Sequence, residues 1–99
     1  MNDASETKTL YTLSGELDLQ SVPRWDEELD AACSRRGAVV QLDLSDVSFI
    51  DSTGLRMLVR LRRLSEAAAG TLILLDPPAQ ALSVLEMAGL TDHFRIDTT

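Results

Sequence analysis

The chain has 99 residues, of which 44% are hydrophobic and 25% charged, and it carries a formal net charge of −7. This length allows one domain with one core, and no stretch reaches the roughly 20 apolar residues that a membrane-spanning helix needs. The negative charge argues against direct binding to nucleic acid, because the phosphate backbone repels an acidic surface. We therefore expect one domain over residues 1–99 that neither binds nucleic acid directly nor inserts into a membrane.

The N-terminal third predicts one strand followed by one helix. Residues 1–8 are polar, and we expect them to be frayed. Apolar residues over 10–13 mark the strand, and residues 15–18 lead out of it. The helix then opens with Ser21 as its N-cap and Pro23 in its first turn, where the missing amide hydrogen of proline is not needed.

The middle of the chain runs from an apolar strand over residues 38–44 into a helix over residues 52–69. The connection between them, residues 45–51, is rich in Asp and Ser. Ser52 stands where the helix begins, and Gly54 behind it keeps side-chain bulk low. Backbone amides at a helix start are unpaired, and they favour a serine oxygen as cap and equally a phosphate. Ser52 is therefore either an N-cap or a phosphorylation switch.

The C-terminal third predicts a strand, a helix and a short packed segment. Residues 71–75 form a continuous apolar run, which is typical of a strand covered on both faces. Residues 76–78 turn the chain, a helix follows over residues 79–88, and residues 90–96 form the packed segment. The alternation of strands and helices predicts an α/β fold: a mostly parallel or mixed four-stranded sheet with helices mainly on one face.

The helix from Ser52 divides into three faces at 100° per residue. Its core face is expected to hold four apolar residues, Met57, Leu61, Leu64 and Ala68. The opposite face carries three cations, Arg56, Arg60 and Arg63. Between these faces, Leu55 and Val59 form a partly exposed strip beside Arg62. This strip is either a docking face for a partner or simply packs beneath a neighbouring loop.

The residue types argue against an enzyme. The only histidine that could serve Ser52 as a base is His93, at the far end of the chain, and no Gly-rich phosphate-binding loop exists. The acidic residues are spread too widely for a metal site. We therefore predict no catalytic residues, no metal and no cofactor. The single Cys33 and the polar N-terminus, which lacks the apolar segment of a signal peptide, predict a cytoplasmic protein.

Three motifs occur in order along the chain. They are SGELD at residues 14–18, LDLSDVSFIDSTGL at residues 42–55 and MAGLTDHFRI at residues 87–96. The second motif closely resembles the signature of STAS domains, the bacterial anti-sigma factor antagonists. The first resembles the motif that follows the family's first strand, and the third resembles the family's usual ending. The resemblance covers most of the chain and implies a single STAS-like domain.

In antagonists of this family, the serine directly after the aspartate is phosphorylated by the anti-sigma factor, which is itself a serine kinase. The resemblance gives this role to Ser52. It implies that the unphosphorylated protein binds the kinase and frees a sigma factor, and that a serine phosphatase restores this unphosphorylated form. The residues expected to contact the partner are Asp18, Asp51, Ser52, Thr53, Gly54, Leu55, Arg56 and Val59.

Two alternatives stay open for the function. A STAS subunit of a membrane lipid-transport ABC complex, or of another signalling assembly, acts as a binding module without phosphorylation. The adjacent Asp51 and Ser52 favour the antagonist, because a protein outside kinase control has less reason to keep this acceptor pair. Individual roles also stay open: Asp18 is a turn-forming carboxylate or an interface residue, and Thr53 is structural or a minor second acceptor.

Arg56 departs from the family pattern, in which many members carry a small residue at this place. The difference bears on the choice of partner, through charge and bulk, and not on the fold. We expect the domain to be a monomer or a weak dimer.

Overall fold

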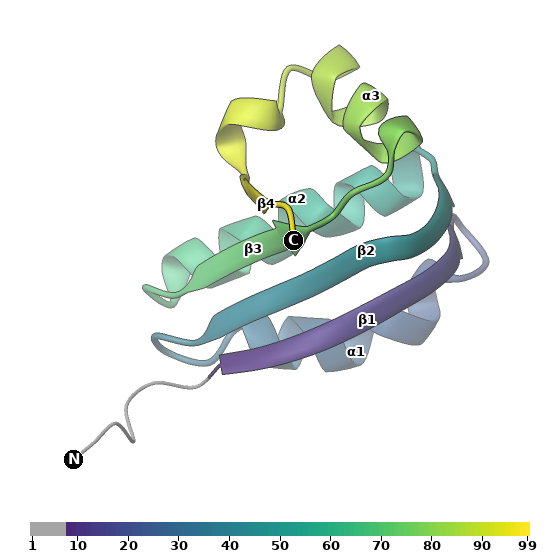
Figure 1. Ribbon diagram of the computed structural model, residues 1–99. Helices are drawn as coiled ribbons and strands as arrows, with labels where there is room; N and C mark the ends of the chain where they lie inside the picture. Colours follow the sequence, from purple (N-terminus) through teal and green to yellow (C-terminus); the bar gives the residue numbers. More distant parts are fainter. Residues whose placement is uncertain (1–7) are drawn as a thin grey trace.

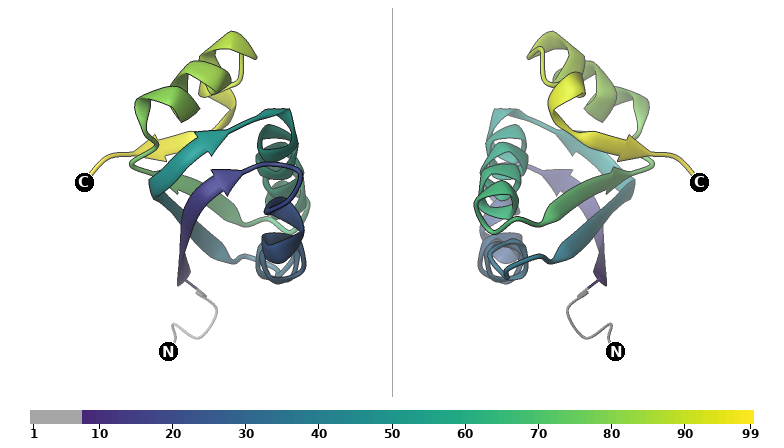
Figure 2. Two further views of the ribbon diagram at one scale, coloured as in Figure 1. Left: turned by 90° about the vertical axis from the view of Figure 1, so that its right-hand side faces the viewer. Right: turned by 90° about the vertical axis from the view of Figure 1, so that its left-hand side faces the viewer.

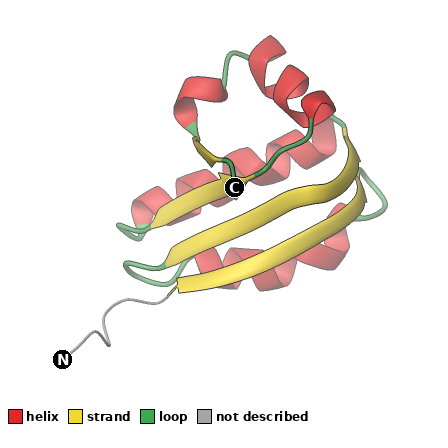
Figure 3. Ribbon diagram, in the orientation of Figure 1, coloured by secondary structure: helices red, strands yellow, loops and turns green. Residues whose placement is uncertain are grey.

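The structure, a computed structural model, describes residues 8–99 (Figure 1; Figure 3 shows the elements by type). Its elements in chain order are β1 (Lys8–Leu17), α1 (Val22–Cys33), β2 (Val39–Ile50), α2 (Ser52–Ala67), β3 (Thr71–Leu75), α3 (Ala79–Met87), the 3-10 turn η2 (Thr91–His93) and β4 (Arg95–Asp97). The expected fraying of residues 1–8 falls outside the described residues, except at Lys8, where β1 already begins.

The four strands form one parallel sheet in the order β1-β2-β3-β4. Figure 2 shows α1 and α2 side by side on one face of this sheet, with α3 apart from both. The predicted α/β fold, with a four-stranded sheet and helices mainly on one face, is therefore confirmed. Because the carboxyl ends of parallel strands meet at one edge, the segments that follow β1 and β2 are brought together there.

The core lies between the sheet and the pair α1 and α2, because each layer contributes an apolar face. In β2, Leu42 and Leu44 are at most 1% exposed. In α2, Met57 and Leu61 are fully buried, as the helical periodicity predicted. Burial of an aliphatic side chain of this size is worth about 1.5–3 kcal/mol. These contacts anchor α2 one to three turns beyond its first residue.

The first two strands run further than the sequence predicted. The expected connection over residues 45–51 belongs to β2 as far as Ile50, and β1 continues to Leu17 instead of ending near Gly15. Two shifts in the β1–β2 register, after Thr12 and after Gly15, each place one extra residue in β2. Bulges of this kind interrupt the alternation of buried and exposed residues. The polar residues within them therefore looked like a loop.

The C-terminal quarter differs from the prediction in detail. α3 ends at Met87, one residue before the expected end of the helix at residue 88. The packed segment that was expected over residues 90–96 forms η2 and the start of β4, in which Ile96 pairs with Leu74 of β3. Within the described residues, no helix is both long enough and apolar enough to cross a membrane.

Candidate functional site

Asp51 caps the start of α2. Its Oδ1 accepts hydrogen bonds from the amide of Thr53 at 2.8 Å and from the amide of Gly54 at 3.1 Å. A side-chain oxygen in this position satisfies amides that the helix itself leaves unpaired. The interpretation of Ser52 as the N-cap is therefore wrong, because the cap stands one residue earlier.

Ser52 is the first residue of α2, and its side chain is exposed. Within residues 8–99, its hydroxyl makes no hydrogen bond, and the amides of Thr53 and Gly54 are bound by Asp51 and not by Ser52. Thr53, the next hydroxyl, is half-buried and contributes its amide to the cap. Ser52 thus presents an accessible hydroxyl that has no role in holding the fold.

Gly54 is buried where α2 crosses the end of β1. A Cβ at this position would lie 2.5 Å from the carbonyl oxygen of Leu17 and 2.7 Å from Cγ1 of Ile50, closer than real Cβ atoms approach. The amide of Asp51 donates to the same Leu17 carbonyl at 3.2 Å. Gly54, which was predicted to contact a partner, therefore faces the core and lets the helix start approach β1.

Asp18, which follows β1, lies near the start of α2, which follows β2, because the ends of these two strands pair with each other. Leu17 at the end of β1 pairs with Ile50 at the end of β2. The Asp18 carboxylate accepts hydrogen bonds from the amides of Ser21 at 3.0 Å and Gln20 at 3.1 Å. These hydrogen bonds lower the pKa of Asp18, and the bond from the Ser21 amide has the larger effect. Asp18 therefore forms a turn, and its role at an interface stays a prediction.

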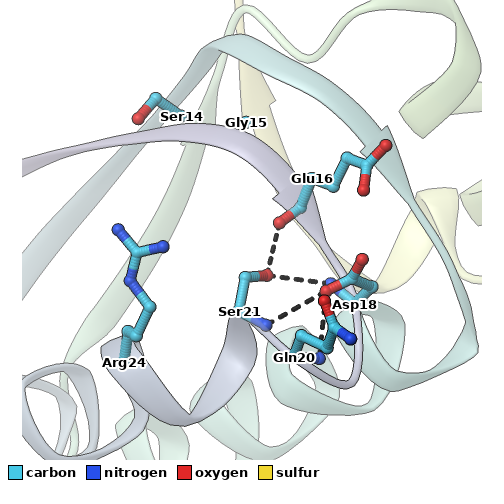
Figure 4. A pocket seen from close by; sticks show the side chains of 7 residues that line it. All are labelled: Ser14, Gly15, Glu16, Asp18, Gln20, Ser21 and Arg24. Carbon is cyan, nitrogen blue, oxygen red and sulfur yellow. Dashed lines mark hydrogen bonds between the residues drawn. The ribbon is translucent and has the colours of Figure 1, made fainter.

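A polar pocket of about 240 Å³ opens beside Asp18 (Figure 4). It is lined by Ser14, Gly15, Glu16, Asp18, Gln20, Ser21 and Arg24. The hydroxyl of Ser21 donates to the carbonyl of Glu16 and accepts from the amide of Asp18 at 3.0 Å. The turn therefore uses this hydroxyl internally, unlike that of Ser52.

A groove of about 470 Å³ runs along α2. It is lined by Leu55, Arg56, Val59, Arg60 and Arg63. At 100° per residue, Ser52 lies on the same stripe of the helix as Arg56 and Val59, so the groove leads away from the exposed hydroxyl. Leu55 and Val59 are half-buried and pack against the core, which leaves part of each side chain accessible. The structure thus places Ser52, Leu55, Arg56 and Val59 along one surface.

The arginines of the groove differ in their surroundings. Arg60 is paired with Asp26 and, at 3.1 Å, with Asp30, both from α1. These two aspartates neutralise the charge of Arg60. Arg56 and Arg63 form no ion pair with any residue of the described range 8–99.

Sequence reasoning missed Gln80, which reaches the site from α3. Its side-chain amide donates to the carbonyl of Ile50 and accepts from the amide of Ile50, both at 2.9 Å. β2 has no strand partner on this side, because its pairing with β3 ends at Asp43. The glutamine therefore takes the place of the missing strand. Nothing in the sequence of this helix, AQALSVLEM, distinguishes Gln80 from its other polar residues, Ser83 and Glu86.

The remaining reactive side chains of residues 8–99 offer little chemistry. Burial, with a smaller effect from the Asp30 carboxylate, raises the pKa of the Cys33 thiol to about 11, so the thiolate is scarce at neutral pH. His93 is exposed on η2. No group of three or more His, Cys, Asp and Glu side chains in this range is arranged to hold a metal ion. The features that remain, an accessible hydroxyl and an adjoining groove, suit a binding surface.

The chain is similar to known regulators over most of its length. The family described as STAS domain matches residues 2–99. The anti-sigma-B factor antagonist of Listeria monocytogenes is 30% identical over 85% of this chain and 74% of its own length. The anti-sigma-B factor antagonist of Bacillus subtilis is 30% identical over 89% of this chain and 80% of its own length.

Two solved structures agree with these sequence matches. The anti-sigma factor antagonist SpoIIAA in its unphosphorylated form has a TM-score of 0.77 and 26% identity, over 94% of this chain and 81% of that one. The Bacillus cell fate determinant SpoIIAA in its phosphorylated form has a TM-score of 0.71 and 27% identity, over 93% and 83%. The family match over nearly the whole chain, with relatives at 30% identity, confirms the resemblance of the three motifs. The chain belongs to the STAS domain family, and its similar relatives are anti-sigma factor antagonists.

Proposed function

We propose that the protein is an anti-sigma factor antagonist that is switched by phosphorylation of Ser52. In its unphosphorylated form it binds an anti-sigma factor with serine kinase activity, and a sigma factor is released. The kinase phosphorylates Ser52, which abolishes binding, and a serine phosphatase returns the protein to its binding form. The relatives named as antagonists support this class of function.

The accessible hydroxyl of Ser52 carries the proposal. Because Asp51 caps α2, a kinase can modify Ser52 without removing a contact that the fold needs. The half-buried Thr53 is less accessible, which favours Ser52 as the acceptor. SpoIIAA has been solved in an unphosphorylated and a phosphorylated form, and both structures are similar to this chain. This similarity supports a switch in which phosphorylation leaves the fold unchanged.

The physical effect of the phosphate is local. Phosphorylation adds about −1.5 to −2 charges near pH 7, directly beside the carboxylate of Asp51. At an interface that accepted a small hydroxyl, this charge is desolvated and imperfectly paired, which costs several kcal/mol. Since about 1.4 kcal/mol changes affinity tenfold, this cost is sufficient to abolish binding without a conformational change.

The test uses wild type, Ser52→Ala and Ser52→Glu as baits in lysate of the organism that encodes the chain, with mass spectrometry of the captured proteins. We expect wild type and Ser52→Ala to capture a small ATP-binding kinase that Ser52→Glu does not capture. Addition of Mg-ATP to the wild-type complex should place phosphate on the peptide that contains Ser52. Thr53→Ala is the matched control and should be phosphorylated like the wild type.

Two results would contradict the proposal. Equal capture of the same partners by all three baits would show that charge at Ser52 does not control binding. Recovery of transporter ATPase subunits alone would move the protein to the lipid-transport alternative. The comparison requires that all three baits fold, which their circular dichroism spectra check.

A further inference from the structure

A phosphate on Ser52 would meet helix-start amides that are already in use. The amides of Thr53 and Gly54 donate to the side chain of Asp51. The amide of Leu55 donates to the backbone carbonyl of Asp51 at 2.9 Å. A helix start usually offers such amides to an anion, but here the Asp51 carboxylate occupies those of Thr53 and Gly54. Among these amides only that of Ser52 has no acceptor within residues 8–99, and one amide does not balance a dianion. The counter-charge for the phosphate then has to come from a side chain.

Arg56 stands one turn beyond Ser52 on the same stripe of α2. Side chains at positions i and i+4 of a helix are neighbours, with Cβ atoms about 5–6 Å apart, and an acid that precedes a base is the favourable order. Arg56 is exposed and has no ion-pair partner among residues 8–99. A guanidinium can bind a phosphate through two parallel hydrogen bonds. Arg56 can therefore reach a phosphate on Ser52 without a change of backbone.

Arg56 also contributes to the charge of the groove. Arg60 is neutralised by two aspartates of α1, so Arg56 and Arg63 carry the uncompensated positive charge of the groove. Both lie on a chain whose net charge is −7, and the half-buried Leu55 and Val59 provide apolar surface between them. This combination complements a partner segment that carries acidic side chains around an apolar face.

We propose that phosphoserine at position 52 pairs with Arg56 and thereby withdraws from the groove a cation that otherwise binds an acidic, apolar segment of the anti-sigma factor. The identity of this partner rests on the proposed function, whereas the pair itself requires only the phosphate. In the unphosphorylated protein, Arg56 and Arg63 both face the partner. After phosphorylation, the dianion holds Arg56, so binding loses an attraction in addition to meeting repulsion.

The pair is tested by 31P NMR on the full chain with phosphoserine installed at position 52. A paired cation favours the dianion, so the second phosphate pKa should be lower in the wild type than in Arg56→Gln, by about 0.2–0.4 pH unit. Arg63→Gln is the matched control. It lies eleven residues beyond Ser52, about 16 Å along the helix, and should leave the wild-type value unchanged. Equal values in wild type and Arg56→Gln would overturn the proposal.

The acidic occupant is tested with the kinase that the wild-type bait captures. Unphosphorylated Arg56→Gln and Arg63→Gln should each bind this kinase about 2–5-fold more weakly, and the loss should shrink at high salt. Wild-type affinity in both variants would overturn the acidic occupant and leave the phosphorylation switch intact. Capture of no kinase would overturn the proposed function and this occupant together, while the 31P measurement would still decide whether the pair forms.

Discussion

The two strand-to-helix junctions at the carboxyl edge of the sheet use the same residue types in opposite ways. At the β1–α1 junction, the carboxylate of Asp18 binds turn amides, and the hydroxyl of Ser21 is held between the carbonyl of Glu16 and the amide of Asp18. At the β2–α2 junction, the carboxylate of Asp51 binds helix amides, and the hydroxyl of Ser52 is exposed. Ser21 stands three residues after Asp18, and its hydroxyl bonds to the backbone of the turn. Ser52 directly follows Asp51, and its hydroxyl makes no such bond.

This difference teaches how a modifiable serine can be recognised. Before α1, an aspartate and a serine side chain both hydrogen-bond to the backbone of the junction. Before α2, only the aspartate side chain does so, and the fold therefore does not depend on the serine. A hydroxyl in that position can be modified while the junction stays intact.

The largest effect is expected from Gly54→Ala at the second junction. The added Cβ would lie 2.5 Å from the Leu17 carbonyl oxygen, so α2 has to move away from β1. We expect a cost of about 3 kcal/mol, which the better helix propensity of alanine, about 1 kcal/mol, offsets only in part. Urea unfolding followed by circular dichroism measures the net loss. The control Thr53→Ala should stay within about 0.5 kcal/mol, and wild-type stability in Gly54→Ala would refute the close approach.

Asp51→Ala is expected to lower the free energy of unfolding by about 1 kcal/mol, because the amides of Thr53 and Gly54 lose their acceptor. Asp51→Asn should retain most of this stability, since asparagine caps helices about as well as aspartate. The same urea experiment measures both variants. Equal losses in Ala and Asn would show that charge, and not the cap bond, holds the helix start.

Matched serine variants compare the two junctions directly. Ser21→Ala removes a hydroxyl that makes two hydrogen bonds, and we expect a loss of about 1 kcal/mol. Ser52→Ala removes a hydroxyl that makes none with the described residues and should stay within about 0.5 kcal/mol of the wild type. Thermal unfolding of the two variants side by side measures the difference. The contrast between the junctions would fail if Ser52→Ala were the less stable variant.

The smallest effect concerns the first junction at low pH. Amides of Ser21 and Gln20 lower the pKa of Asp18 below 3.8. A carboxyl with a lowered folded-state pKa stabilises the fold above its unfolded value, and this contribution is lost as pH falls through the folded value. A 13C NMR titration of the carboxyl carbon should therefore give a midpoint below 3.8 for Asp18. A midpoint at or above 3.8 would show that the turn does not hold the charged form.

The fold could be predicted from sequence where periodicity is unbroken. The apolar run of β3 was predicted correctly, and so was the burial of Met57 and Leu61 in α2. Leu64 and Ala68, also expected on the core face of α2, are only half-buried. The ends of β1 and β2 were not predicted, because bulges disturb the alternation after Thr12 and Gly15. A bulge depends on the partner strand, and one strand's sequence does not contain that information.

The sequence predicted most residues of the candidate site, but not the structural role of each. The motif placed Asp51 and Ser52 at the helix start, yet which of the two oxygens reaches the amides depends on a backbone geometry that the sequence leaves open. Gly54 was expected at the surface, and its contact with Leu17 became visible only with the packing of α2 on β1. Gln80 acts from thirty residues away, and no local pattern indicates such a contact.

The bond between Gln80 and Ile50 makes one backbone amide an internal reporter. The Ile50 N–H is protected by a side chain of α3 and not by a neighbouring strand. Its hydrogen–deuterium exchange rate therefore follows the docking of α3, while the amides of the β1–β2 ladder follow the opening of the sheet. Ile50 lies only two residues before Ser52. The exchange rate of this one amide, measured before and after phosphorylation or binding of a partner, therefore shows whether either event changes the docking of α3.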